Sequence, residues 1–117
     1  MIKRSYTIGM MRRRIPVEIH INQYDTDYQL LVYVKPEKGT LDVQSGTTVE
    51  LRGRKPDGTA YTKQVYLSGN NVVLQGDRDL SDIPGKGVYE LCFTRNGKWL
   101  STANFIITVE PSPAERN

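Results

Sequence analysis

Residues 87–110 read GVYELCFTRNGKWLSTANFIITVE, and this stretch decides the fold class. Apolar and polar residues alternate on both sides of Asn96–Gly97, a dipeptide that strongly favours a β-hairpin turn. The large apolar residues that share one face of each predicted strand are Tyr89, Leu91, Phe93, Phe105, Ile107 and Val109. Because one face of a strand carries every second side chain, the stretch predicts two adjacent strands that turn these residues into a common core.

The rest of the chain shows the same period of two. Alternating apolar residues predict further strands at 15–21, 29–35, 47–55, 60–67 and 72–75, with a brief alternation at 41–43. The strand at 29–35 is apolar on both parities, so we expect it to be central and covered on both faces. Pro56-Asp57-Gly58 predicts a tight turn, because proline presets φ and glycine accepts a positive φ. One helical turn is expected within 77–87, and no long helix.

A chain of 117 residues suits a single domain. About seven to nine short strands separated by turn residues are typical of an antiparallel β-sandwich. The segment Gly87-Val88-Tyr89-Glu90-Leu91 resembles the tyrosine corner of immunoglobulin-like sandwiches, although Leu91 stands where an immunoglobulin cysteine would be. We therefore predict an all-β, immunoglobulin-like antiparallel β-sandwich.

The charge distribution divides the chain into three parts. The basic residues that precede position 15, where no acidic residue occurs, are Lys3, Arg4, Arg12, Arg13 and Arg14. We expect residues 1–14 to form a basic arm that orders on a partner, residues 15–110 the sandwich, and residues 111–117 a flexible tail or the start of a linker. All 13 acidic residues lie beyond the arm, so we do not expect a nucleic-acid-binding face on the sandwich.

Membrane, disulfide and zinc proteins fit the sequence poorly. No run approaches the roughly 18 apolar residues that span a bilayer, and residues 1–11 lack the apolar segment of a secretory signal. Cys92 is the one cysteine, so it has no internal disulfide partner. We expect a soluble protein whose core alone stabilises the fold.

Candidate catalytic and metal-binding residues have simpler structural interpretations. His20, the one histidine, lies on the polar side of its predicted strand and is expected to be a surface residue. Cys92 is expected to be packed or half-buried, with nothing near it in sequence to activate the thiol. The aspartates whose spacing suits calcium, but which form no EF-hand pattern, are Asp25, Asp27, Asp77, Asp79 and Asp82. We therefore expect no enzymatic activity, no cofactor and no bound metal.

Exposed aromatic residues leave a binding role open. Trp99, together with Tyr61 and Tyr66, could form a platform on which the apolar face of a sugar stacks. The alternative interpretation is that Trp99 caps the end of the sandwich or lies in a protein contact, and we favour it. A carbohydrate-binding or adhesin-type surface module is thus the second functional hypothesis.

Several motifs in a fixed order resemble one known family. They are LVYV at 31–34, LDVQSGTTV at 41–49, KPDG at 55–58, PGKGVY at 84–89 and LSTANFIITVE at 100–110. In this order they resemble the N-terminal domain of phage baseplate upper proteins, found in tailed phages and prophages of Gram-positive bacteria. The similarity extends from about Val17 to Glu110. It implies a virion component of the tail baseplate, assembled in the bacterial cytoplasm.

The resemblance also implies how such a domain works. It would dock onto the central baseplate and help to position host-recognition components, with other baseplate and tail proteins as partners. In longer family members a region that carries receptor-binding proteins follows the domain, whereas this sequence ends at Asn117 soon after Pro111-Ser112-Pro113. From charge and parity, the candidate docking residues are the arm residues Lys3, Arg4, Arg12, Arg13 and Arg14 together with Arg52, Arg54 and Arg95.

Overall fold

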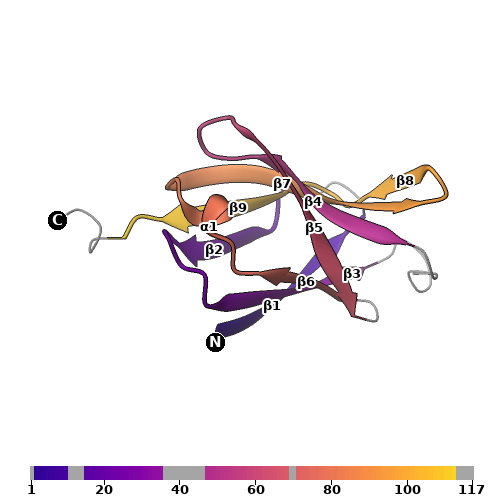
Figure 1. Ribbon diagram of the computed structural model, residues 1–117, viewed down its shortest axis with the longest axis horizontal. Helices are drawn as coiled ribbons and strands as arrows, with labels where there is room; N and C mark the ends of the chain where they lie inside the picture. Colours follow the sequence, from indigo (N-terminus) through magenta and orange to yellow (C-terminus); the bar gives the residue numbers. More distant parts are fainter. Residues whose placement is uncertain (1, 11–14, 36–46, 69–70, 113–117) are drawn as a thin grey trace.

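The computed structural model describes residues 2–10, 15–35, 47–68 and 71–112 (Figure 1). These residues form nine strands and one short helix. The elements are β1 (Ile2–Gly9), β2 (Glu18–Asn22), β3 (Tyr28–Lys35), β4 (Thr48–Arg54), β5 (Ala60–Ser68), β6 (Asn71–Gln75), α1 (Arg78–Ser81), β7 (Gly85–Arg95), β8 (Lys98–Ser101) and β9 (Phe105–Glu110). The predicted all-β class without a long helix is confirmed for the described residues. The alternation at 41–43 and the end of the predicted tail lie outside them.

The strands form one mixed sheet that curls into a nearly closed barrel. Their order is β1-β3-β6-β5-β4-β7-β9-β2, and β8 pairs with β7 off this path. Six of the pairings are antiparallel, but β1 runs parallel to β3 and β2 runs parallel to β9. The prediction of an antiparallel, immunoglobulin-like sandwich therefore needs correction. Alternation shows which side of a strand is buried, but not which distant strand it pairs with.

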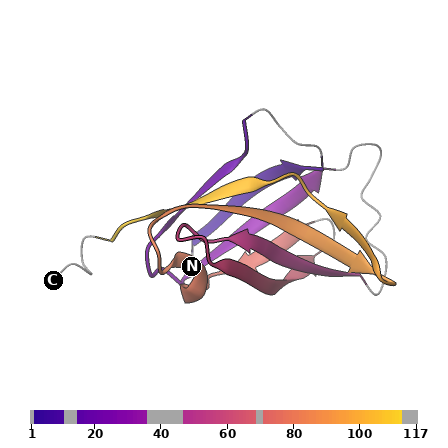
Figure 2. The ribbon, with the colours of Figure 1, turned by 90° about the horizontal axis from the view of Figure 1, so that it is seen from above.

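Strand β5 closes one side of the barrel. Its residues Ala60–Val65 pair with β4, and its last three residues pair with β6 instead. The chain therefore passes from one half of the sheet to the other within a single strand, and Figure 2 shows the resulting curl. On the opposite side β1 and β2 end the strand order, and the Arg4 guanidinium donates a 3.0 Å hydrogen bond across this seam to the His20 carbonyl.

The first strand corrects the expected role of the N-terminus. Ile2–Gly9, which we assigned to the basic arm, is β1 and pairs with the whole of β3. Ile8 is buried in the core, and the Ala103 amide donates to the Gly9 carbonyl at 3.0 Å. The assignment of residues 2–9 to a flexible segment is therefore wrong, because their short alternation of Tyr6 and Ile8 was outweighed by the neighbouring charges. The division of the chain at residues 14 and 110 stays a prediction.

The core confirms the main prediction from the opening stretch. All six large apolar residues named there are buried, and Phe105 is fully enclosed, with its ring 6.4 Å from that of Tyr89. The stretch nevertheless contains three strands rather than two. Thr102 interrupts the ladder, since its hydroxyl oxygen accepts from the Leu91 amide at 3.0 Å and β9 begins only at Phe105.

Other local predictions hold with shifted limits. The Pro56-Asp57-Gly58 turn joins β4 to β5, with the Gly58 amide donating to the Lys55 carbonyl at 2.8 Å. The predicted helical turn is α1, and Leu80 is buried beneath it. Ile15, the first residue of the predicted strand at 15–21, is 77% exposed, because β2 begins only at Glu18.

Candidate functional site

The outer face of the first half of the sheet carries an uncharged row of side chains. Across β1, β3, β6 and the end of β5, Ser5 pairs with Leu31, Leu31 with Val73, and Val73 with Tyr66. Tyr33 lies in the next row, between Thr7 and Asn71. We call the surface formed by Ser5, Thr7, Leu31, Tyr33, Tyr66 and Val73 the tyrosine face.

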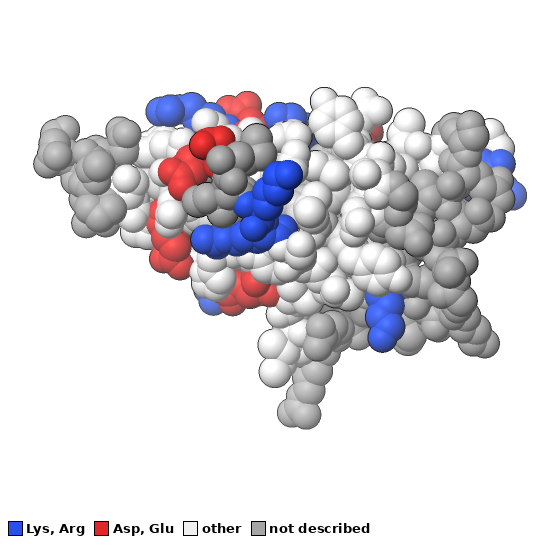
Figure 3. All heavy atoms as spheres, turned by 90° about the horizontal axis from the view of Figure 1, so that it is seen from below, with Lys and Arg blue, Asp and Glu red and all other residues white. Residues whose placement is uncertain are grey.

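The tyrosine face has the composition of a protein contact surface. Tyr66 is 66% exposed and Tyr33 is 41% exposed, while Leu31 and Val73 are half-buried between them. Figure 3 views the molecule from the side of β1 and β6, where acidic and basic side chains gather towards one end and most of the remaining described surface is uncharged. The centres of protein interfaces are depleted in charge and enriched in tyrosine. This face can therefore hold a protein partner through apolar and hydroxyl contacts.

Sequence reasoning missed this face although its signal was present. The strand at 29–35 is central, between β1 and β6, as predicted. Its second apolar parity was expected to be covered as well, but Tyr33 is exposed on that side. Apolar residues on both parities of a strand fit two arrangements. The strand is covered on both faces, or one of its faces is an exposed contact surface.

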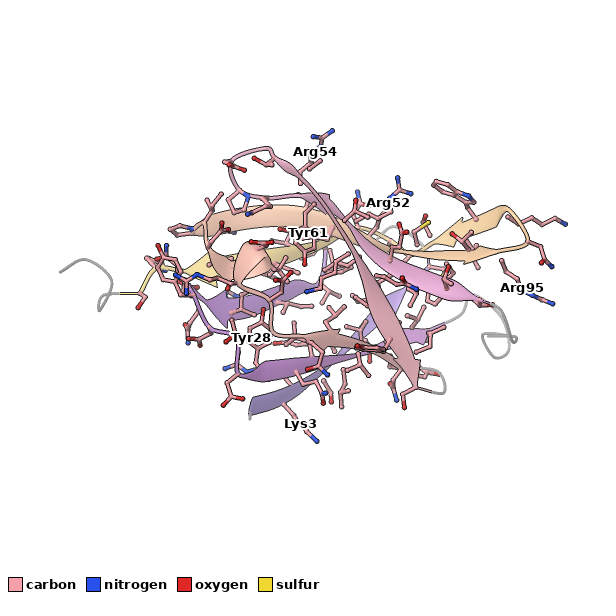
Figure 4. The ribbon with its side chains drawn as sticks, viewed as in Figure 1. Lys3, Tyr28, Arg52, Arg54, Tyr61 and Arg95 are labelled. Atoms are coloured by element: carbon pink, nitrogen blue, oxygen red, sulfur yellow. The ribbon has the colours of Figure 1, made fainter. Side chains whose placement is uncertain are left out.

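The candidate basic docking residues do not share one surface. Figure 4 places Lys3 on the underside of the molecule, Arg52 and Arg54 on the upper side, and Arg95 at the far end. Arg12, Arg13 and Arg14 lie outside the described residues. Arg4 also differs from Lys3, because its guanidinium is engaged by the His20 carbonyl.

Two of these arginines have local partners. The Arg52 guanidinium lies 4.8 Å from the centre of the Trp99 ring, and its Nη1 is 3.8 Å from the Cys92 sulfur. Arg54 donates to the Gly58 carbonyl at 3.3 Å and so holds the β4–β5 turn. Cys92 is buried, in agreement with the packed thiol that we expected.

The aromatic residues of the glycan hypothesis are separated by the fold. Tyr61 is buried and donates its hydroxyl hydrogen to Asp77, so it is not available for stacking on a sugar. Tyr66 lies on the tyrosine face, whereas Trp99 pairs with Thr94 on the outer side of the other half of the sheet. A platform of Trp99, Tyr61 and Tyr66 is therefore not assembled.

Asp77 organises a structural cluster at the base of α1. Its carboxylate caps the helix by accepting a hydrogen bond from the Asp79 amide at 3.2 Å. The Lys63 Nζ lies 3.2 Å from the Oδ2 of the same carboxylate. Partial burial raises the pKa of the Asp77 carboxyl, but hydrogen bonds from Tyr61 and Lys63 outweigh it and hold that pKa below its usual range. The Ser81 hydroxyl donates to the Asp25 carbonyl at 3.1 Å, which fixes the helix against the β2–β3 turn.

His20 lies at the surface, as predicted, between two carboxylates. Its Nε2 is 3.2 Å from Glu18 and its Nδ1 is 3.1 Å from Glu110. A hydrogen bond from Thr108 lowers the pKa of the Glu18 carboxyl. Within the described parts of the chain, no three His, Cys, Asp or Glu side chains gather as a metal site. The helix found there is also too short and polar to span a bilayer.

Comparison with solved structures shows a likeness in fold. No protein-family model matches the sequence, and no curated protein matches it. Among solved structures, the fold is similar to that of the N-terminal domain of phage TP901-1 ORF48. The TM-score is 0.71 at 12% sequence identity, and the alignment covers 94% of this chain and 99% of that chain. The two chains therefore share a fold over nearly their whole lengths.

Proposed function

We propose that this chain is a structural domain of a phage tail baseplate. The observation that carries the proposal is the fold likeness to a domain of a phage protein over almost the full length of both chains. The ordered motifs between Val17 and Glu110, which resemble the baseplate upper proteins, support the same assignment from the sequence. In this role the domain docks onto the central baseplate and helps to position host-recognition components, without catalysing a reaction.

The tyrosine face supplies the docking surface in this proposal. Fully burying an aliphatic or aromatic side chain stabilises a contact by ~1.5 to 3 kcal/mol, and the partly exposed side chains here contribute a share of that each. Tyrosine loses little conformational freedom when it is buried, and its hydroxyl can bond to the partner. Uncharged neighbours such as Ser5 and Thr7 add no charge that would have to be desolvated.

A particle experiment tests the proposal. Particles are induced from the source cells with a DNA-damaging agent, purified, and labelled with an antibody to this domain. We expect label at the tail tip, and particles that carry tails without label would contradict the proposal.

Surface variants then test the docking face. The double variant Tyr33→Asp/Tyr66→Asp places two charges on the tyrosine face and is expected to abolish incorporation into particles. Thr62→Asp is the control, because Thr62 is exposed on the outer side of β5 where β5 pairs with β4. Equal incorporation of both variants would show that the tyrosine face is not the docking surface.

A further inference from the structure

The β7–β8 hairpin extends beyond the core. Phe93 and Leu100 are paired across it, yet Phe93 is 6% exposed and Leu100 is 53% exposed. The apolar surface therefore continues past the point where the core ends. Figure 1 shows this hairpin projecting at the end of the molecule opposite to the end of β9. We call residues 95–100 the hairpin tip.

The hairpin tip is held in one conformation by its turn. Asn96 and Gly97 have φ angles of 51° and 75°, so both central residues of the two-residue turn are left-handed. This is the geometry of the primed turns whose twist matches the two strands. Arg95 and Lys98 pair directly across the turn. A partner would therefore meet a preorganised element and would not have to order it on binding.

Apolar side chains project from both sides of the hairpin tip. Trp99 is 64% exposed and lies on the side of Thr94, while Leu100 lies on the side of Phe93. A surface depression beside them is lined by Thr47, Phe93, Arg95, Lys98, Trp99 and Leu100, among others. Trp and Arg dominate the binding energy of many protein interfaces when they enter a desolvated pocket. Because both sides are apolar, a groove that encloses the hairpin would bury more of it than a flat surface.

The charge of the hairpin tip indicates the chemistry of that groove. Arg95 and Lys98 are both exposed, Arg52 stacks on Trp99, and residues 94–101 include no acidic residue. Complementary charge at the rim of an interface steers association and selects the partner. We propose that the hairpin tip inserts into an apolar groove with an acidic rim on another protein. The proposal rests on the proposed function only in taking that protein to be a component of the same tail.

A protein groove fits the hairpin tip better than a lipid bilayer or a nucleic acid. Insertion of Trp99 into a bilayer would carry the Arg52 guanidinium stacked on it towards the hydrocarbon, which is costly. A nucleic-acid strand requires a continuous basic track. Beside the hairpin, Glu50 pairs with Cys92 and Glu90 pairs with Arg52, so acidic residues interrupt such a track.

Photo-cross-linking tests the contact in assembled particles. A benzoylphenylalanine residue replaces Trp99 or Leu100 in the full chain, and the particles are irradiated and analysed by mass spectrometry. The same replacement at Asn22 is the control, because Asn22 is exposed and pairs with Glu110 at the end of the molecule opposite the hairpin. We expect positions 99 and 100 to cross-link to one tail protein, within a segment rich in Asp and Glu, and position 22 to give no such product.

Reversing the charge of Lys98 tests the acidic rim. The affinity is measured in a purified complex of the full chain with the protein to which the hairpin tip cross-links. Lys98→Glu is compared with Lys86→Glu, which makes the same charge change on another exposed lysine of β7–β8. We expect Lys98→Glu to weaken the complex about tenfold at low salt, with a smaller loss at high salt, and Lys86→Glu to leave it within about twofold. Equal effects of the two reversals would overturn the proposed acidic rim.

The outcomes separate this inference from the proposed function. Particles that contain the domain but give no cross-link from positions 99 and 100 overturn the inference and leave the function standing. Cross-links to lipid or nucleic acid also overturn it. Particles that lack the domain overturn the proposed function. The same cross-linking is then carried out in whole cells that express the full chain. A cross-link from positions 99 and 100 to one protein, within a segment rich in Asp and Glu, supports the inference, and its absence overturns it.

Discussion

The hydroxyl of Tyr61 donates a hydrogen bond to the carboxylate of Asp77, and this bond joins β5 to the N-terminus of α1. The Tyr61 ring also packs edge-on against Tyr89, with 6.0 Å between the ring centres. One side chain thereby connects the polar cluster around α1 with the aromatic part of the core. Tyr61, which the sequence suggested as a sugar-stacking residue, therefore stabilises the fold.

Removing the Tyr61 hydroxyl tests that bond. Tyr61→Phe should lower the free energy of unfolding by about 1.5 to 3 kcal/mol, because a partly buried hydrogen bond to a charged group is lost while the ring stays packed. Chemical denaturation measures the change. Tyr66→Phe is the matched control, since Tyr66 is exposed and its loss of a hydroxyl should be nearly neutral. A Tyr61→Phe variant as stable as its parent would show that this hydrogen bond does not stabilise the fold.

Alkaline pH should unfold the protein through its buried tyrosines. Burial raises the pKa of both Tyr28 and Tyr89 from 10.0 to about 12. The unfolded chain therefore loses these protons at a lower pH than the folded chain. Their contribution to stability is complete below pH 10 and is lost as the pH rises towards about 12.

Circular dichroism and phenolate absorbance, followed together against pH, check this expectation. A late fraction of the tyrosines should ionise only as the fold is lost. Tyr28→Phe should reduce the loss of stability above pH 10, because it removes one of the shifted groups. Ionisation of every tyrosine near pH 10 with the fold intact would contradict the prediction.

Phe105 should be among the most sensitive core positions. Phe105→Ala is expected to cost about 3 to 5 kcal/mol, because Phe105 is fully buried and the cavity would open against Tyr89. Its neighbour Asn104 is exposed, so Asn104→Ala should be tolerated. Chemical denaturation of the two variants compares them directly, and a near-neutral Phe105→Ala would show that β9 is assigned to the wrong face.

A side chain at Gly53 should disturb the pairing of β4 with β7. A Cβ atom there would lie 2.1 Å from the Val88 carbonyl oxygen and 2.7 Å from the Tyr89 Cα, so the backbone would have to move. Gly53→Ala is expected to cost about 1 to 3 kcal/mol, as overpacking generally does. Thr48→Ala, at an exposed position of the same strand, is the control for a local change. Hydrogen exchange of the β4 and β7 amides should become faster in Gly53→Ala alone.

Local patterns predicted the strands but not their arrangement. The opening stretch, the Pro56-Asp57-Gly58 turn and the alternation in β4 concern neighbours in sequence, and all of them reappear in the structure. The parallel pair of β2 with β9 joins residues more than eighty positions apart, and no local pattern encodes it. The sequence pattern did not predict β1, because the charged residues Lys3 and Arg4 interrupt the alternation of its apolar residues.

The candidate site was predictable only in part. Parity placed Arg52 and Arg54 together on one outer face, but it could not reveal that Lys3 lies on the opposite side. The same reasoning left Tyr61 in a surface platform, since its partner Asp77 comes from a different element. The tyrosine face combines β1, β3, β5 and β6, and it becomes visible only when their register is known.

Electron cryo-microscopy of tails from induced particles tests the central claim most directly. The account predicts density at the baseplate that fits the nine described strands, with the tyrosine face against another tail protein and the hairpin tip in a groove. A well-resolved baseplate with no place for this fold, in particles from cells that express the chain, would contradict the claim that it is a structural domain of the tail.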